Sequence, residues 1–196
     1  MMNRDENGWI GTHTGTKFWP LEPAASEVHI EDIAHSLARQ CRFNGHCRGF
    51  YSVAEHSIEV SRHVPRAKRF ALWGLLHDAA EAYLSDLVRP IKAQCHYQVP
   101  TTTMRSGHRL QTYRECEAQI QRCIADRFCL DFPIPTEVDD ADNRMLVTER
   151  SQLFNENQPH WDALDGVEPY LVKLQCLNWQ TAEMFFLNRF QELNHG

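Results

Sequence analysis

The chain has 196 residues, of which 42% are hydrophobic and 23% charged, and its formal net charge is −6 at pH 7. This length is typical of one domain, and a chain of this size buries enough apolar surface to fold without disulfides. The negative net charge argues against a protein that coats nucleic acid, because such a protein needs clustered Lys and Arg. A local Arg or a metal ion can still bind a small anionic substrate.

No run of apolar residues approaches the ~18 that a membrane span needs, and the polar residues 1–6 lack the apolar core of a secretory signal. We therefore expect a cytoplasmic protein with no membrane partner. The seven cysteines include no Cys-x-x-Cys pair, and their odd number also argues against a disulfide framework or a structural zinc cage. They are typical of small, partly buried apolar side chains.

The spacing of apolar residues is helical along most of the chain. Residues 14–23 come before the first helix, and their Gly and Pro favour a loop or an extended edge. A helical stripe then runs from residue 30 to residue 41. Ser52 and Glu55 form a capping box that begins a second helix, and Pro65 ends it.

Residues 70–84 are apolar on almost every side, which predicts a helix buried at the centre of the fold. Residues 97–107 are rich in Thr, Pro, Ser and Gly and predict a flexible surface excursion. No internal repeat and no second hydrophobic core are visible, so the pattern predicts one all-α domain that spans all 196 residues. The remaining helical stripes cover residues 120–128, 138–153 and 179–193.

The dipeptide His77-Asp78 lies inside the apolar segment and is the centre of the candidate chemistry. A buried carboxylate needs a cation or a dense set of hydrogen bonds, and imidazole beside carboxylate suits a divalent transition metal. His56 lies on the inward face of the preceding helix, and Asp142 on the inward side of a later one. Taken alone, His56 also fits a hydrogen-bonded core histidine, and Asp142 a solvated helix start. Together, the four side chains from three helices can meet at one point.

The order His, His-Asp, Asp resembles the HD-domain phosphohydrolase superfamily. More narrowly, three segments are similar to the YfbR/YfdR-like 5′-deoxynucleotidases of bacteria and phages, to which the phage dATP triphosphohydrolases are related. They are residues 42–46 (Arg-Phe-Asn-Gly-His), 51–57 (Tyr-Ser-Val-Ala-Glu-His-Ser) and 77–86 (His-Asp-Ala-Ala-Glu-Ala-Tyr-Leu-Ser-Asp). The resemblance runs from about Phe18 to Arg150 and implies a compact HD-domain helical bundle.

The resemblance also implies one divalent transition metal ion, held by His56, His77, Asp78 and Asp142. Its open coordination positions would take water and a phosphate oxygen, so that the ion lowers the pKa of the water and neutralises phosphoryl charge. Imidazole and carboxylate ligands suit Co, Mn, Zn, Ni and Fe, and the sequence does not choose among them.

In the resembling family, the glutamate that Glu81 matches handles the attacking water or the leaving group, and the aspartate that Asp86 matches lies near the sugar or that water. An exposed helix glutamate and a turn aspartate are the alternative interpretations. Arg42 matches the phosphate-binding arginine of the family. Phe43 stands where these nucleotidases often carry Trp, which leaves the preference for base and sugar open.

Two further residues are candidates for substrate binding. Lys92 can contact phosphate, although a surface lysine is the alternative, and Trp19 can stack on a base, although core packing is the alternative. Glu149 follows Asp142 by seven residues on the same helix face, and is a candidate hydrogen-bond partner at the metal site.

The favoured function is a phosphohydrolase for a small deoxynucleotide, first a monophosphate and second a dNTP such as dATP. A hydrolase of a signalling nucleotide is another hypothesis, but Ala82 replaces the acidic residue that follows this glutamate in (p)ppGpp hydrolases, and the Gly-x-x-Tyr-Pro signature of cyclic-dinucleotide enzymes is missing. The complete ligand set with Glu81 and Arg42 argues against a non-catalytic module. No nucleic-acid polymer is expected as a partner, and a homo-oligomer stays open.

Overall fold

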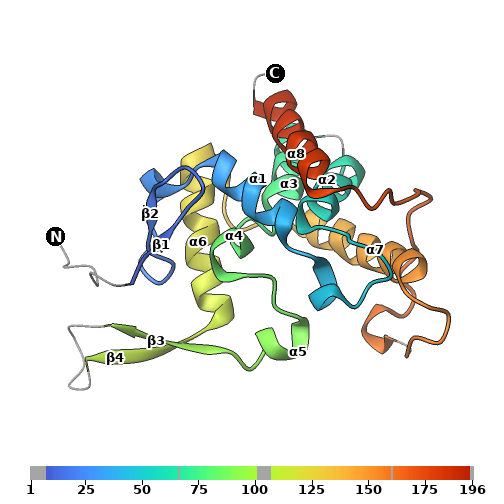
Figure 1. The fold of residues 1–196 in the computed structure, drawn as a ribbon, viewed down its shortest axis with the longest axis horizontal. Coiled ribbons are helices and arrows are strands. Elements are labelled where there is room, and N and C mark those ends of the chain that lie inside the picture. Colours follow the sequence, from blue (N-terminus) through green and yellow to red (C-terminus); the bar gives the residue numbers. More distant parts are fainter. Residues whose placement is uncertain (1–7, 66, 101–106, 160, 195–196) are drawn as a thin grey trace.

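The structure, a computed structural model, describes residues 8–65, 67–100, 107–159 and 161–194. These residues form a mostly helical bundle with two small antiparallel sheets, β1 with β2 and β3 with β4, on its periphery (Figure 1). The strands are β1 (Ile10–Gly11), β2 (Lys17–Phe18), β3 (His96–Pro100) and β4 (His108–Thr112). The helices are α1 (Ile30–Arg39), α2 (Val53–His63), α3 (Lys68–Leu76), α4 (Glu81–Leu84), α5 (Arg89–Lys92), α6 (Tyr113–Phe128), α7 (Thr136–Leu153) and α8 (Trp179–Asn194). Short 3-10 turns lie at Ala25–Glu27, Arg42–Gly45 and Asp162–Leu164.

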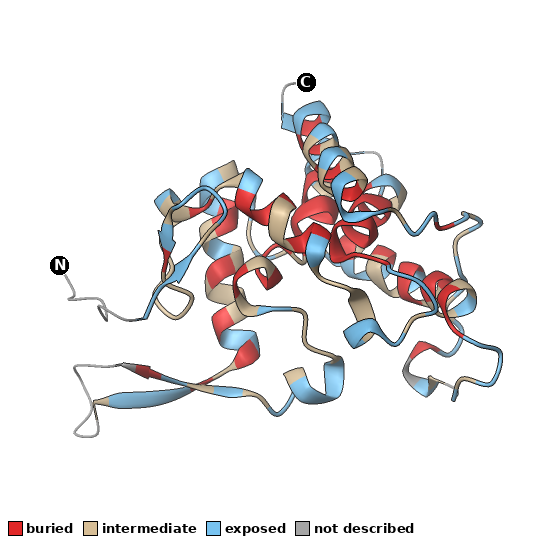
Figure 2. Cartoon of the chain, viewed as in Figure 1, coloured by how far each residue is buried: buried red, intermediate tan, exposed pale blue. Residues whose placement is uncertain are grey.

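Helix α2 forms the centre of the bundle. It packs against α1, α3, α7 and α8, and every residue from Val53 to Ser61 is buried. The buried residues of Figure 2 accordingly concentrate where these helices meet. The helix begins as predicted, because Oγ of Ser52 accepts a hydrogen bond from the backbone N–H of Glu55 at 3.1 Å. This placement puts His56 in the core of the protein.

Helices α2 and α3 approach each other most closely at Gly74. A Cβ atom at this position would lie 2.9 Å from Cα of Ser61, so a larger residue would push the two backbones apart. Oγ of Ser61 also donates to the carbonyl of Ala71 at 2.7 Å across the same contact. The contact therefore fixes the distance between α2, which carries His56, and the end of α3, where His77 follows.

The single helix predicted over residues 70–84 is divided in the structure, so that prediction was wrong. Helix α3 ends at Leu76 and α4 begins at Glu81. Between them the backbone N–H groups bond to the carbonyl three residues earlier, as Glu81 does to Asp78 at 2.9 Å. This tighter winding is typical of a 3-10 turn. His77 and Asp78 therefore lie in a turn at the end of α3 and not within a continuous helix.

The prediction of a purely all-α domain was also wrong. Residues 97–107 were predicted as a flexible excursion, but most of strand β3 lies at the start of this segment. It pairs with β4, which follows the segment, with His96 opposite Thr112 and Val99 opposite Arg109. Residues 101–106 lie outside the described residues. Strand β3 alternates polar and apolar residues over only four positions, His96 to Val99, and β4 buries the polar Gln111 and exposes Leu110, so the hairpin gives only a weak strand signal.

The helices predicted in the C-terminal half are confirmed. Helix α6 buries Ile120 and Ile124, and α8 buries Phe186 and Phe190. Among the described residues, no helix combines the length and the apolar character that a membrane span requires.

Candidate metal centre

Three side chains from different segments bring their donor atoms together in the core. Nε2 of His56, on α2, lies 3.2 Å from Nε2 of His77, at the end of α3. The same nitrogen of His56 lies 3.1 Å from Oδ1 of Asp142, on α7, and Nε2 of His77 lies 3.9 Å from that oxygen. This group of His56, His77 and Asp142 can hold a metal ion.

Asp78 brings a fourth donor to the group. Its Oδ2 lies 3.3 Å from Nε2 of His77 and 3.5 Å from Nε2 of His56. Metal bonds of ~2.0–2.2 Å place neighbouring ligand atoms about 2.8–3.6 Å apart in octahedral or tetrahedral geometry. Four of the five separations, from 3.1 to 3.5 Å, fall in that range, and the fifth is 3.9 Å.

The second nitrogen of each histidine is fixed by an acceptor. Nδ1 of His56 donates to Oε1 of Glu149 at 2.6 Å, and Nδ1 of His77 donates to the carbonyl of Gly74 at 2.8 Å. Because the ring proton of a neutral imidazole then lies on Nδ1, the lone pair of each Nε2 points into the group. Two lone pairs facing two carboxylate oxygens at these distances favour a cation between them.

The electrostatics of the group also favour a cation. Burial, the largest single influence, lowers the pKa of His77, but Asp78, Asp142 and the hydrogen bond to Gly74 together outweigh it and raise this pKa to about 9. Burial likewise raises the pKa of Asp142, but the hydrogen bond and charge of His56, together with the charge of His77, outweigh it and lower this pKa to about 2. The carboxylates therefore stay ionised, and the group binds positive charge as protons or as a metal ion that displaces them.

Arg42 connects Glu149 to Asp78. Its Nε and Nη2 each lie 3.1 Å from Oε2 of Glu149, and its Nη1 lies 3.4 Å from Oδ2 of Asp78. Burial opposes the charge on the guanidinium, but Glu149 and Asp78 outweigh it and raise the pKa of Arg42. The arginine predicted to bind phosphate therefore also positions two of the carboxylates around the metal group.

The turn that carries Arg42 is strained. Phe43 and Asn44 have φ angles of 58° and 51°, in the left-handed region that most residues avoid. Gly45 follows with a φ of 76°, which glycine adopts without cost. The turn directs Phe43 toward Phe154, and their ring centroids lie 4.9 Å apart in an edge-to-face arrangement.

Glu81 and Lys92 form a buried pair next to the metal group. Nζ of Lys92 lies 3.0 Å from Oε1 of Glu81 and 2.8 Å from Oε1 of Glu117, so Lys92 is not the free surface lysine of the alternative interpretation. Oε2 of Glu81 is buried and has no hydrogen-bond partner among the described residues. Burial, followed by the charges of Asp78 and Asp86, raises the pKa of Glu81 well above its usual value, although Lys92 opposes this.

Asp86 is placed by a second strained turn. Ser85 has a φ of 71°, and Oη of Tyr113 donates to its carbonyl at 2.7 Å. The backbone N–H of Asp86 donates to Oε1 of Gln40 at 2.9 Å, and Nε2 of Gln40 donates to the carbonyl of Glu81 at 3.1 Å. One amide side chain therefore holds both ends of the segment that carries the two predicted catalytic residues.

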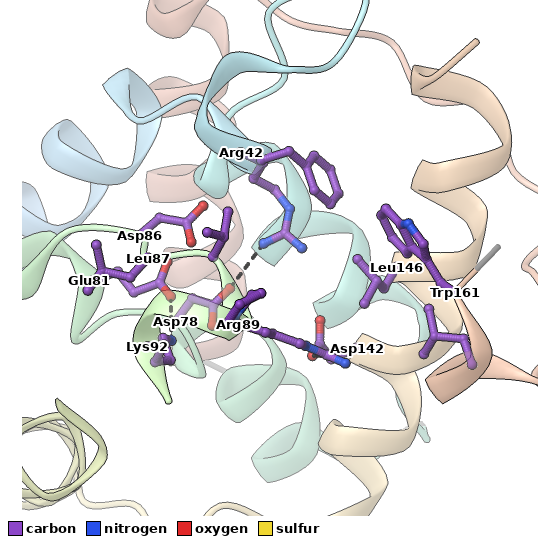
Figure 3. Close-up of a pocket in the computed structure, with 14 residues that line it drawn as sticks. Arg42, Asp78, Glu81, Asp86, Leu87, Arg89, Lys92, Asp142, Leu146 and Trp161 are labelled. Carbon is purple, nitrogen blue, oxygen red and sulfur yellow. Dashed lines mark hydrogen bonds and ion pairs between the residues drawn. The ribbon is translucent and has the colours of Figure 1, made fainter. Parts of the chain in front are cut away.

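Arg42, Glu81, Asp86 and Lys92 line one cavity of about 430 Å³, a volume typical of small-molecule sites (Figure 3). The structure brings nine of the ten predicted residues to the cavity or to the metal group beside it: His56, His77, Asp78, Asp142, Glu81, Asp86, Arg42, Lys92 and Phe43. The tenth, Trp19, is not among the lining residues. The lining is Arg42, Phe43, Asp78, Glu81, Asp86, Leu87, Val88, Arg89, Pro90, Lys92, Asp142, Leu146, Trp161 and Leu164.

Arg89, Trp161 and Leu164 are among the cavity residues that sequence analysis did not select. Arg89 is 59% exposed in its side chain and lies 3.8 Å from Oδ2 of Asp142. In the sequence, only its position three residues after Asp86 indicated that Arg89 could lie near the site. Trp161 and Leu164 lie in an irregular segment after α7, where no periodicity predicts which residues turn inward.

A second group, His13, His35 and Glu183, also has donor atoms close enough for a metal ion. Its carboxylate, however, already pairs with Arg39 at 2.8 Å. The two imidazole rings stack with centroids 3.6 Å apart and planes only 7° apart, so their in-plane lone pairs run nearly parallel and do not converge on one point. The group around His56 is the better candidate.

The fold and the site define a mostly helical protein with a buried group that can hold a metal ion. No protein-family model matches the chain. The chain is 35% identical over 188 residues to the protein of Escherichia coli (strain K12) named "Uncharacterized protein YfdR", a match that covers 95% of this chain and 96% of YfdR. It is also 41% identical over 180 residues to an uncharacterized protein of Rhodobacter capsulatus, across 86% of this chain and 85% of that protein. The chain belongs to the family of YfdR.

Proposed function

We propose that the protein is a metal-dependent phosphohydrolase of the HD-domain type, and that it removes phosphate from 2′-deoxynucleoside 5′-monophosphates. One observation carries this proposal. The donor atoms of His56, His77, Asp78 and Asp142 converge at the side of a cavity that also holds positively charged side chains. A site that combines metal ligands with cations suits an anionic substrate and polarises a phosphoryl oxygen.

A divalent ion in this group would lower the pKa of a bound water and neutralise charge on the phosphoryl group. Arg42 supplies a guanidinium whose position is fixed by Glu149 and Asp78, so it orients a phosphate with little loss of side-chain entropy. Lys92 adds a second fixed cation on the Glu81 side of the cavity.

Glu81 is proposed to carry the proton. Lys92 occupies its Oε1, which leaves Oε2 for a water or for the leaving-group oxygen. Its raised pKa favours the protonated form, which can donate a proton to the departing 5′-oxygen of the sugar. The hydrogen bond from Gln40 to the carbonyl of Glu81 keeps the residue in position.

Phe43 and Asp86 are proposed to contact the sugar. The apolar ring of Phe43 offers a 2′-hydroxyl no hydrogen-bond partner, which favours deoxyribose over ribose. One apolar slot rejects an added hydroxyl by only ~10²-fold, so we expect a preference for deoxyribose and not an absolute requirement.

A dNTP is the second candidate substrate, and one observation favours it. Arg89 lies at the cavity with a side chain that is 59% exposed, beyond the buried Arg42. An additional exposed cation at the cavity suits the outer phosphates of a triphosphate. In that case the product is triphosphate and not orthophosphate.

The experiment that tests the proposal incubates the purified, metal-loaded protein with dAMP, AMP, dATP and ATP. Chromatography resolves nucleoside, orthophosphate and triphosphate. Release of orthophosphate from dAMP supports the first candidate, and release of triphosphate from dATP supports the second. The proposal fails if none of the four compounds is cleaved with any of Co, Mn, Zn, Ni or Fe.

A further inference from the structure

We infer that the apolar side of the cavity is a nucleobase subsite, that Trp161 forms its stacking surface, and that the subsite favours purines over pyrimidines. This inference rests on the proposed function and specifies the class of base that the substrate carries.

The cavity has two chemically different sides. Figure 3 shows Glu81, Asp86 and Lys92 on one side and Leu146 and Trp161 on the other, with Arg42 and Asp142 between them. All the charged lining residues gather toward the first side and the centre. A nucleotide whose phosphate lies at Arg42 and the metal group therefore directs its other end toward Trp161.

Trp161 is held by neighbouring rings. Phe154 is 7% exposed and packs edge-to-face on Trp161, with ring centroids 5.7 Å apart. Phe43 lies 6.1 Å from the same ring, and the Arg150 guanidinium lies 5.5 Å from it. Because the backbone N–H of Leu164 also bonds to the carbonyl of Trp161 at 2.9 Å, the indole is positioned before any ligand arrives.

The chemistry of this side favours recognition of the face of a base and not of its edge. Phe43, Leu146 and Leu164 carry no side-chain hydrogen-bonding group, and Trp161 carries only a donor. Such a surface attracts any base through stacking and apolar contact, and the larger ring of a purine gains more from both. Adenine and guanine should therefore be distinguished little from each other.

The experiment compares substrates that differ only in the base. Phosphate release from dAMP, dGMP, dCMP, dTMP and 2-deoxyribose 5-phosphate is measured for the wild type, Trp161→Ala and Trp161→Phe. Trp179→Ala is the matched control, because Trp179 is 39% exposed on α8 and is not a lining residue.

We expect Trp161→Ala to raise KM for dAMP about 5- to 150-fold, as expected for one lost base–aromatic stack, with kcat nearly unchanged. KM for 2-deoxyribose 5-phosphate should not change, since this compound has no base. Trp161→Phe should restore most of the affinity for dAMP, and Trp179→Ala should behave as the wild type.

An equal effect of Trp161→Ala on dAMP and on 2-deoxyribose 5-phosphate overturns the inference, because it shows a structural role for Trp161. Equal KM values for purine and pyrimidine substrates overturn the purine preference. If the wild type cleaves no substrate, the proposed function fails, and calorimetric binding of dAMP then decides the inference. Binding that weakens in Trp161→Ala supports the subsite, whereas unchanged or absent binding overturns it.

Discussion

Glu149 and His56 are joined by a hydrogen bond of 2.6 Å between two side chains that are both completely buried. The carboxylate fixes the proton of the ring on Nδ1, and its other oxygen bonds to Arg42 at 3.1 Å. One residue that is no candidate ligand therefore orients a histidine of the candidate metal group and anchors the arginine proposed to bind phosphate.

We predict that Glu149→Gln weakens metal binding by about 10- to 100-fold, the usual effect of losing a charged partner behind a ligating histidine. Isothermal titration with Co²⁺ or Mn²⁺ measures the change. Asp140→Asn is the control, because Asp140 is exposed on the same helix and should leave the affinity unaltered. Equal affinities for all three proteins would contradict the role assigned to Glu149.

We predict that Glu81→Gln lowers kcat by about 10²–10⁴-fold, the range for a positioned acid or base, with the metal still bound. The pH profile adds a second test. Burial and then the Asp78 and Asp86 charges raise the pKa of Glu81, so its acid form persists above the usual carboxyl range and is lost as pH rises through the raised value. The wild type should therefore show a fall in kcat at alkaline pH that the variant lacks. Wild-type turnover in Glu81→Gln would remove the residue from the mechanism.

We predict that Gly74→Ala destabilises the protein by about 1–3 kcal/mol through overpacking, although alanine favours a helix more than glycine does. The added Cβ would lie 2.9 Å from the backbone of Ser61, and a backbone atom cannot rotate away. The midpoint of urea unfolding measures the effect. Gly11→Ala is the control, since its Cβ would make only a 3.8 Å contact with a side chain. A Gly74→Ala protein as stable as the wild type would show that α2 and α3 separate without cost.

We predict that deoxyribonucleotides are cleaved about tenfold faster or more than ribonucleotides, in kcat/KM, because the apolar ring of Phe43 offers a 2′-hydroxyl no hydrogen-bond partner. Rates for dAMP and AMP under one metal condition give the ratio, and Phe43→Ala should reduce it. Equal rates for the two sugars in the wild type would refute the sugar preference and leave the phosphohydrolase proposal intact.

The sequence predicted the elements whose signals are local. The helix start at Ser52 and the apolar stripe of α8 are encoded within a few turns of helix, and both are confirmed. Only half of the predicted capping box forms, because the Glu55 carboxylate accepts from the backbone N–H groups of residues 175–177 and not from that of Ser52. The candidate ligand set was also accessible, because His56 lies on the buried side of α2, His77 comes directly after the apolar residues of α3, and Asp142 follows a buried position of α7. The structure brings the three side chains together.

The rest depends on contacts between distant segments. The helical pattern of the sequence continues across the tight turn after Leu76, so periodicity does not reveal where helix α3 ends. The position of the Trp161 ring depends on Phe154 and Phe43, which come from different parts of the chain. The alternating pattern of the β3–β4 hairpin is limited to four residues of β3. Trp19 does not line the cavity, and nothing in the sequence alone fixed its position in the fold.

The central claim is that a metal ion at His56, His77, Asp78 and Asp142 is required for phosphate release. The most direct measurement follows hydrolysis of dAMP after the protein is stripped with a chelator and then resupplied with Mn²⁺ or Co²⁺, with bound metal quantified in parallel. We predict that activity is lost on stripping and returns as the bound metal reaches one ion per chain, and that Asp142→Asn regains neither. Full turnover in excess chelator, with no metal bound, would contradict the account.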